Sequence, residues 1–415
     1  MTTINFKSLN ALEVKLYGER IGVITRLGAD RYLFSFEQSY IDDRNRPTLS
    51  LSFKGRQGGL VLPTGAITGR LPPFFSNLLP EGNLRDYLAA RAGVKPQREF
   101  FLLAVLGADL PGALAVTPMD AQGATTPQGE HTEDEQLPPT ALRFSLAGVQ
   151  LKFSAVMEAS GGLTIPAGGM GGSWIVKLPS ARFVAVPENE YAMLALARAV
   201  GITVPQTELV DIGTIQGLPK DAATLGGKAL AVKRFDRGAD HEQIHMEDFA
   251  QVFGIFSDNK YERRSYSNIA SVLWAETGET GTYEFVRRLA FSVLIGNADM
   301  HLKNWSLLYP DRRTPILSPA YDLVATLPYL PGDQLALTFG ESRSLDGITP
   351  EQLRRFADNA RLPLSPLLPI ILEIADRTVS EWGRLAEKDL LPNEIRTAIE
   401  KHIGAVGKRI LQLAR

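Results

Sequence analysis

The sequence contains no cysteine, and this absence removes several classes of site at once. Disulfide bonds, zinc–thiolate centres, iron–sulfur clusters and thiol nucleophiles all require that residue. The five histidines are scattered along the chain, and such spacing does not indicate a zinc site. The 415 residues carry a formal net charge of −2, so there is no global electrostatic case for binding nucleic acid.

Long hydrophobic runs are missing as well. No stretch approaches the roughly 18 consecutive apolar residues that a membrane-spanning helix needs. The N-terminal sequence MTTINFKSLN has neither a basic segment nor an apolar core, which argues against a secretory signal. We therefore expect a cytoplasmic protein with no membrane partner. With 44% hydrophobic and 22% charged residues, the composition is that of a globular protein, and the length allows two or three domains.

The most informative stretch follows an apolar run that ends at Gly296. Asp299 and Asn304 have the D-x-x-x-x-N spacing of the protein-kinase catalytic loop, where the Asp takes the proton of the acceptor hydroxyl and the Asn holds a metal ion. Asp322 follows two short apolar segments, and a tight connection between them would bring it beside Asn304 to share Mg²⁺. The alternative is that these are turn and cap residues, because Asp and Asn side chains bond readily to nearby backbone.

Two further features upstream match parts of a kinase. The strand-like run Trp174–Leu178 carries Lys177, at the place where a kinase keeps the lysine that pairs with nucleotide phosphates. The alternative is a surface lysine on an edge strand. The helix after Pro187 carries Glu190 in its first turn, where it could pair with Lys177. An acid favoured by the helix dipole is an equally good interpretation of Glu190.

A glycine-containing stretch supplies a candidate phosphate loop. Gly148 lies in SLAGVQLKFS, between Ser145 and the polar pair Gln150 and Lys152. A glycine in such a setting lets backbone N–H groups approach a phosphate closely, although an ordinary hairpin turn would have the same composition.

We predict four segments along the chain. Residues 1–117 form a small antiparallel sheet with helices, 118–140 an acidic and polar linker, 141–237 a strand-rich lobe, and 238–415 a helical lobe. The helices expected in the last segment are Met246–Phe253, Tyr266–Thr277, Thr282–Ile295, Pro350–Asn359, Leu367–Trp382 and Asn393–Ala414. Three arginines, Arg354, Arg355 and Arg361, fall close together there, and a solvated helix face is a better interpretation than a DNA-phosphate patch.

Taken in order, these features predict an α+β, two-lobed kinase-like fold. A loop with glycine, a lysine on a strand, an acid on the next helix, D-x-x-x-x-N and a later Asp follow one another as a kinase requires. The strings G-x-G-x-x-G and H-R-D are absent, which excludes a mainstream protein kinase.

Six ordered motifs carry a resemblance to a known family. They are SLAGVQLKFS (145–154), WIVKLP (174–179), AVKRFDR (231–237), MEDFAQ (246–251), GNADMHLKN (296–304) and PAYDL (319–323). Together they resemble the HipA family of serine/threonine kinases, the toxins of HipBA toxin–antitoxin systems. LPPFFSNLLPEG (71–82) is similar to the N-terminal domain of that family. The resemblance covers nearly the whole chain.

The resemblance implies a role for each matching position. Asp299 would be the catalytic base, Lys177 the ATP-phosphate lysine, and Asn304 and Asp322 the Mg²⁺ ligands. Ser145 would be the serine that is autophosphorylated, which expels the phosphate loop and switches the kinase off. The remaining nucleotide contacts would come from the phosphate loop, the hinge and the catalytic segment: Ala147, Gly148, Val149, Gln150, Leu151, Lys152, Lys233, Arg234, Phe235, His301, Leu302, Lys303 and Tyr321. Lys233 and Leu151 stand where other residues are common in the family, so fine nucleotide contacts differ there.

The resemblance also implies partners. Family members phosphorylate an aminoacyl-tRNA synthetase, glutamyl-tRNA synthetase in the best-known case, and so stall translation. A HipB-like helix-turn-helix antitoxin neutralises them and provides the contact with DNA. A rival hypothesis is a nucleotide-binding co-repressor that no longer transfers phosphate. The presence together of Lys177, Asp299, Asn304 and Asp322 argues against it. A third is a small-molecule kinase on a similar scaffold, because acceptor choice depends on surface shape that no motif records.

Overall fold

The computed structural model of the protein describes residues 8–28, 30–119, 152–157, 162–165, 172–218, 222, 224–238 and 242–414. Three separate hydrophobic cores and three sheets organise these residues. The predicted linker, except for its first two residues, and the predicted phosphate loop up to residue 151 lie outside the described residues. No helix of the described chain is long and apolar enough to cross a membrane.

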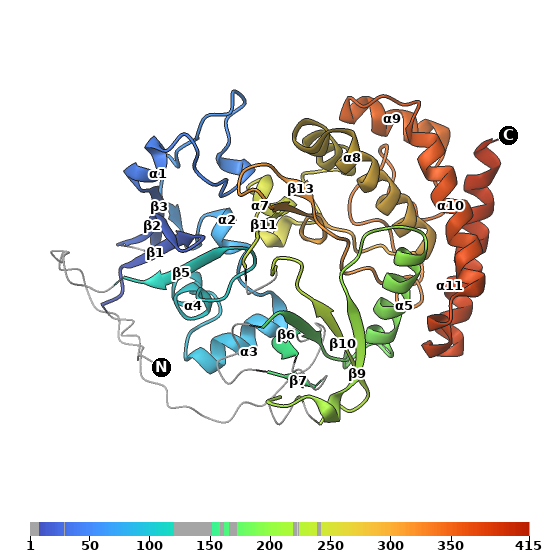
Figure 1. Cartoon of the computed structure of the whole chain (residues 1–415), viewed down its shortest axis with the longest axis horizontal. Coiled ribbons are helices and arrows are strands. Elements are labelled where there is room, and N and C mark those ends of the chain that lie inside the picture. The colour runs from blue at the N-terminus through green and yellow to red at the C-terminus, as the bar shows by residue number, and fades with distance from the viewer. Residues whose placement is uncertain are drawn as a thin grey trace.

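The N-terminal part, blue to cyan at the left of Figure 1, is built on an antiparallel sheet. Alternate side chains of β1 are buried, as expected for a strand with one face on a core. The strands, in the order β4-β3-β2-β1-β5, are β4 (Ile67–Thr68), β3 (Arg31–Phe36), β2 (Glu19–Leu27), β1 (Ala11–Leu16) and β5 (Leu114–Pro118). The helices are α1 (Gln38–Asp42), α2 (Pro73–Ser76), α3 (Gly82–Ala92) and α4 (Glu99–Leu106).

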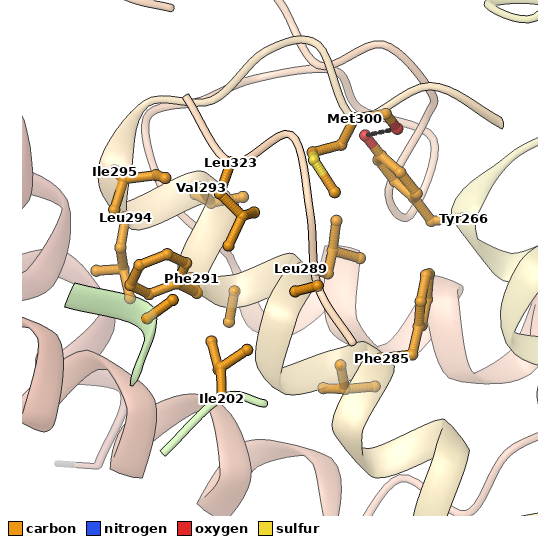
Figure 2. Close-up of a cluster of buried hydrophobic side chains, with 14 of the residues drawn as sticks. Ile202, Tyr266, Phe285, Leu289, Phe291, Val293, Leu294, Ile295, Met300 and Leu323 are labelled. Carbon is orange, nitrogen blue, oxygen red and sulfur yellow. Dashed lines mark hydrogen bonds between the residues drawn. The ribbon is translucent and has the colours of Figure 1, made fainter. Parts of the chain in front are cut away.

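A second sheet lies below the centre of Figure 1 and carries the predicted lysine. Its strand order is β7 (Leu163–Thr164), β6 (Lys152–Met157), β8 (Trp174–Lys177), β10 (Lys228–Lys233) and β9 (Thr207–Asp211). Helix α5 (Val186–Ala199) follows β8 and packs against β9 and β10. Buried side chains of α5 join the core around helix α8, and Figure 2 shows Ile202, just beyond α5, in this cluster.

The rest of the chain is mainly helical. Helix α8 (Tyr266–Ile295) packs against the three C-terminal helices at the right of Figure 1. These are α9 (Pro350–Ala360), α10 (Leu367–Arg384) and α11 (Asn393–Leu411). A small three-stranded sheet, in the order β11 (His245–Asp248), β12 (Ser306–Tyr309) and β13 (Ile316–Leu317), lies beside the short helix α7 (Phe249–Val252).

The second half of α8 explains where the predicted catalytic loop begins. Phe285, Leu289, Phe291 and Leu294 are each at most 2% exposed, so this end of the helix is buried on nearly every side (Figure 2). The helix ends at Gly296, whose φ of 70° is the left-handed conformation that favours glycine at a helix C-terminus. The chain therefore leaves the helix at one fixed point.

One of the expected helices differs from the structure. A single helix is expected over Met246–Phe253, but its first part is strand β11, which pairs with β12, and α7 begins only at Phe249. Asp248 caps α7 by accepting from the backbone N–H of Gln251 at 2.8 Å. The two helices expected on either side of residues 278–281 are both present within the element α8, and non-helical backbone at Gly278, with a φ of 63°, separates them.

The three arginines of the predicted basic segment occupy an exposed face of α9. Arg354 and Arg355 both form ion pairs with Glu351 one turn earlier, and Arg355 also pairs with Glu341. Arg361 ends the helix with a positive φ of 57°. The two central arginines are thus engaged with neighbouring carboxylates.

Candidate active site

Buried and exposed residues alternate along the catalytic loop, and the buried ones attach the loop to the core. Ala298, Met300 and Leu302 are at most 2% exposed and fix the loop to the core, while Asp299 between them is exposed. The backbone C=O of Met300 accepts a hydrogen bond from Tyr266 of α8 at 3.1 Å, which is drawn in Figure 2. The result is a rigid platform that presents Asp299 at the surface.

Short polar contacts complete the loop. Asn297 Oδ1 accepts a hydrogen bond from the backbone N–H of Asp299 at 3.0 Å. Asn304 Nδ2 donates to the backbone C=O of Asp299 at 2.7 Å. The D-x-x-x-x-N spacing therefore closes a small ring in which the Asn amide holds the backbone of the Asp.

A buried lysine lies between two carboxylates that come from distant parts of the chain. Lys177 Nζ bonds both Glu190 of α5 and Asp322. The side chains of Lys177 and Glu190 are 6% and 2% exposed. Of the two interpretations of Glu190, the pair with Lys177 is the one found in the structure.

The charges in this cluster stabilise one another. Burial alone would lower the pKa of Lys177, but Asp322 and Glu190 outweigh it and hold that pKa above its ordinary value. Burial alone would raise the pKa of Asp322, but Lys152, whose Nζ lies 3.3 Å away, and Lys177 hold it well below its usual range. The site therefore keeps a charged lysine and an ionised carboxylate at neutral pH.

Asp322 also has an unusual backbone. Its φ of 53° lies in the left-handed region, which an L-residue with a side chain adopts at a cost that is smallest for Asp and Asn. Such conformations gather at functional sites because the surrounding structure must maintain them. The preceding residue, Tyr321, is anchored to the catalytic loop by a hydrogen bond of 2.8 Å from its hydroxyl to the backbone C=O of Lys303.

The donor set fits a magnesium ion. The amide nitrogen of Asn304 is used in the bond to Asp299, which leaves its oxygen as the atom that a metal ion can take, and Asp322 offers a carboxylate. Within the described residues no three His, Cys, Asp or Glu side chains cluster as a metal cage. Mg²⁺ in kinases needs no such cage, because one or two protein ligands, phosphates and waters complete its shell.

The predicted hinge residues have three different environments. Lys233 is exposed at the end of β10. Arg234 is buried and binds Asp236 and Asp109, which joins the hinge to the N-terminal part. Phe235 lies against Tyr321, with ring centroids 5.6 Å apart. Of the three hinge residues, Phe235 is therefore the one that offers a flat apolar surface suited to a base.

Three residues of the catalytic segment make their closest contacts with the core, the N-terminal part and Tyr261. Leu302 is fully buried in the core. Lys303 Nζ donates to the backbone C=O of Asn77 at 2.7 Å and lies 3.1 Å from Glu81 Oε1, both in the N-terminal part. His301 contacts Tyr261 edge to face, and burial lowers its pKa to about 3, so its ring is neutral. Ser145 and the loop residues 147–151 lie outside the described residues.

Sequence reasoning missed two residues that contact this loop. Tyr261 Oη donates to Asp299 Oδ1 at 2.8 Å, and Glu81 pairs with Lys303 and Lys260. Glu81 lies in the motif LPPFFSNLLPEG, which offered a signal for it. Tyr261 stands in no recognisable spacing relative to Asp299, so nothing local pointed to it.

Comparison with known proteins gives a consistent result. The model of the HipA N-terminal domain matches residues 12–117, and that of the HipA-like C-terminal domain matches residues 144–382. Y4dM of Sinorhizobium fredii, named as a candidate kinase, is 50% identical over 403 residues, which cover 96% of this chain and 97% of that protein. The serine/threonine-protein kinase toxin HipA of Shewanella oneidensis is 28% identical over 366 residues, 78% of this chain and 80% of that protein.

A solved structure agrees in fold. The structure of Shewanella oneidensis HipA with HipB and its operator DNA matches with a TM-score of 0.72 and 23% identity, covering 97% of this chain and 99% of that chain. At that identity the likeness speaks for the fold, which is the mixed α+β fold expected from the sequence. Because the C-terminal domain match alone spans more than half of the residues, the chain belongs to the HipA family of kinases.

Proposed function

We propose that the chain is an ATP- and Mg²⁺-dependent serine/threonine protein kinase that acts as the toxin of a toxin–antitoxin system. The observation that carries this proposal is the position of the Lys177 ammonium between Glu190 and Asp322. An active protein kinase needs both the Lys–Glu ion pair and the metal-binding Asp in place. A protein that only binds nucleotide has no need to maintain this buried arrangement.

The residues divide the work of phosphoryl transfer. Lys177 would bind the nucleotide phosphates, and Lys152, beside Asp322, would add a second positive charge. Mg²⁺ held by Asn304 and Asp322 would neutralise charge on the phosphates. Phe235 and Tyr321 would flank the adenine ring. Asp299 would orient the acceptor hydroxyl and take its proton.

The exposure of Asp299 supports a protein as the acceptor. Lys177 is buried, whereas Asp299 lies at the surface of the loop. A hydroxyl carried on a protein segment can reach an exposed base, while a small metabolite needs an enclosing pocket. By the resemblance, the acceptor would be an aminoacyl-tRNA synthetase and the cell would stop translating.

Regulation would follow the family pattern. Phosphorylation of Ser145 would place about −2 charges beside the nucleotide phosphates and so repel them. A HipB-like antitoxin would neutralise the toxin and supply the contact with DNA. The Shewanella oneidensis structure that matches this fold is a complex of HipA with HipB and operator DNA, which supports such a partner. The proposed place of action is the cytoplasm.

The packing supports the proposed lobes in part. The N-terminal part and the second sheet each have a core of their own, while the core of the helical region also includes buried residues of α5 together with Leu230 and Val232 of β10. We assign 1–117 to the N-terminal subdomain, 118–140 to a linker, 141–237 to the lobe with Lys177 and 238–415 to the lobe with Asp299.

The test is the intact mass of the purified chain after incubation with ATP and Mg²⁺, beside Asp299→Asn. A gain of one phosphate that maps to Ser145, in the wild type only, is the expected result. A wild type that starts unphosphorylated and gains no phosphate would contradict the proposal and favour the co-repressor hypothesis.

A further inference from the structure

Tyr261 makes direct contact with the proposed catalytic base. Its hydroxyl donates to Asp299 Oδ1 at 2.8 Å, a full-strength hydrogen bond to a carboxylate. The residue lies before α8, in the stretch between the short 3₁₀ turn Ser257–Asn259 and the helix start at Tyr266. Nothing in the family resemblance or in the kinase spacing assigns a role to it.

The tyrosine is held in place by the catalytic loop itself. Its ring packs edge to face on His301, with centroids 5.1 Å apart. The ammonium of Lys260 lies 5.5 Å from the ring centroid, and the backbone C=O of Lys260 accepts from Leu302 N at 3.3 Å. Arg343 donates to the backbone C=O of Tyr261 at 3.0 Å. The ring and the loop therefore form one unit, and moving the hydroxyl away would break several contacts.

The phenol remains a donor across the working pH range. Desolvation and the nearby Asp299 carboxylate raise the pKa of Tyr261 far above its ordinary value. Desolvation also raises the pKa of Asp299, and the hydrogen bond from Tyr261 opposes that rise. Lys260 acts in the same direction as Tyr261, while the carboxylates of Asp322 and Asp333 act against it.

We propose that Tyr261 is a positioning residue for Asp299: it fixes Oδ1 so that Oδ2 receives the proton of the acceptor hydroxyl. This inference rests on the kinase function proposed above. In the step, the bond from the acceptor oxygen to the γ-phosphorus forms and the bond from that phosphorus to the β,γ-bridging oxygen breaks. The acceptor proton passes to Asp299 and ADP leaves. A base oriented by a third group is a recurring arrangement in enzymes.

A competing interpretation is that the phenol stands where the acceptor hydroxyl must go. The geometry favours positioning, because a carboxylate has two oxygens and only Oδ1 is engaged by Tyr261. The packing of the Tyr261 ring on His301 also opposes the movement of the ring that would be needed each time an acceptor binds.

The experiment compares Tyr261→Phe with the wild type in the rate at which labelled phosphate enters the chain, measured over a range of ATP concentrations. We expect the maximal rate to fall about tenfold, a fraction of what a general base contributes. The ATP concentration for half-maximal rate is expected to stay within about twofold, because Tyr261 does not touch the Lys177 cluster.

Tyr283→Phe is the matched control. Tyr283 lies on α8, where its ring contacts Trp274 and not the catalytic loop. The substitution removes a tyrosine hydroxyl, as Tyr261→Phe does. It should behave as the wild type. Thermal unfolding of both variants would show whether the fold is retained.

The outcomes separate this inference from the proposed function. If the wild type incorporates no phosphate, the kinase proposal fails. If the wild type is active and Tyr261→Phe keeps its maximal rate, the kinase stands and the positioning role is wrong. A faster Tyr261→Phe would likewise overturn positioning and identify the phenol as a block on the acceptor site.

Discussion

Lys303 of the catalytic loop bonds to the N-terminal part of the chain through Glu81. Lys303 Nζ lies 3.1 Å from Glu81 Oε1, and Lys260, next to Tyr261, lies 2.6 Å from Oε2 of the same carboxylate. One carboxylate thus joins the N-terminal part to both segments around Asp299. The N-terminal part is therefore a structural support of the active site.

Removing this carboxylate should loosen the support. Burial alone would raise the pKa of Glu81, but Lys303 and Lys260 outweigh it and lower that pKa. A group with a lowered folded-state pKa stabilises the fold above its unfolded pKa, and that contribution is lost as the pH falls. We expect Glu81→Gln to lower the free energy of unfolding by about 1 kcal/mol at pH 7 and by almost nothing near pH 3. Urea unfolding at the two pH values measures this.

A surface carboxylate provides the comparison for Glu81. Glu341 pairs with Arg355 and its side chain is 62% exposed. Glu341→Gln should change the stability by a few tenths of a kcal/mol at most. An equal loss of unfolding free energy in the two variants would mean that the ion pairs of Glu81 contribute no more than an ordinary surface ion pair.

Glu190 allows a test of the buried lysine cluster. Glu190→Gln keeps the size of the side chain and a hydrogen-bond acceptor for Lys177 but removes the charge. We expect phosphate incorporation to slow by at least about tenfold, because the lysine is held less firmly for the phosphates. Glu188, two residues earlier on α5 and only partly buried, is the matched control. Equal rates for Glu190→Gln and Glu188→Gln would remove the ion pair from the mechanism.

The sequence predicted those features whose signals are local. Gly296 marked the end of α8, and D-x-x-x-x-N marked the loop that closes between Asp299 and Asn304. The strand with Lys177 was recognisable from its apolar pattern. The family resemblance added the order of the parts, which no single motif could supply.

What the sequence could not predict depends on contacts between distant segments. Met246–Phe253 was predicted as a helix, but pairing with β12 places its first residues in a strand. The pair between Lys177 and Glu190 was one of two equal possibilities, because its outcome depends on how α5 packs on the sheet. Tyr261 reaches Asp299 only through tertiary folding.

Asn304 provides a test of the metal ligands. Asn304→Ala removes both the amide oxygen offered to Mg²⁺ and the bond to the backbone of Asp299. We expect the Mg²⁺ concentration for half-maximal phosphate incorporation to rise about tenfold. Without Mg²⁺ the wild type should be inactive, yet its thermal unfolding should be unchanged, since the described residues form no structural metal cage. A variant with the wild-type Mg²⁺ dependence would exclude Asn304 as a ligand.

Glu247 should make the stability depend on pH near neutrality. It is fully buried and accepts hydrogen bonds from Ser50 Oγ at 2.5 Å, Leu51 N at 2.9 Å and Tyr309 Oη at 2.5 Å. Burial raises its pKa to about 7, and these bonds oppose the rise. At pH values between the pKa of Glu247 in the unfolded chain and its pKa in the folded protein, the folded state binds more protons than the unfolded state. The free energy of unfolding therefore falls as the pH rises.

Glu247→Gln replaces this carboxyl by a neutral group of the same size and so removes the titration. From pH 6 to pH 8 the wild type should lose about 1 kcal/mol of unfolding free energy relative to the variant. The neighbouring His245, whose pKa burial lowers to about 4, is present in both proteins, so its titration cancels in the difference. Glu351→Gln serves as the control. The hydrogen bond from Arg355 is the main cause that lowers the pKa of Glu351, so this carboxylate does not change its charge near neutral pH. If urea unfolding gave the same pH dependence for wild type and Glu247→Gln, Glu247 would be ionised in the folded protein throughout this range, and its three donors would outweigh its burial.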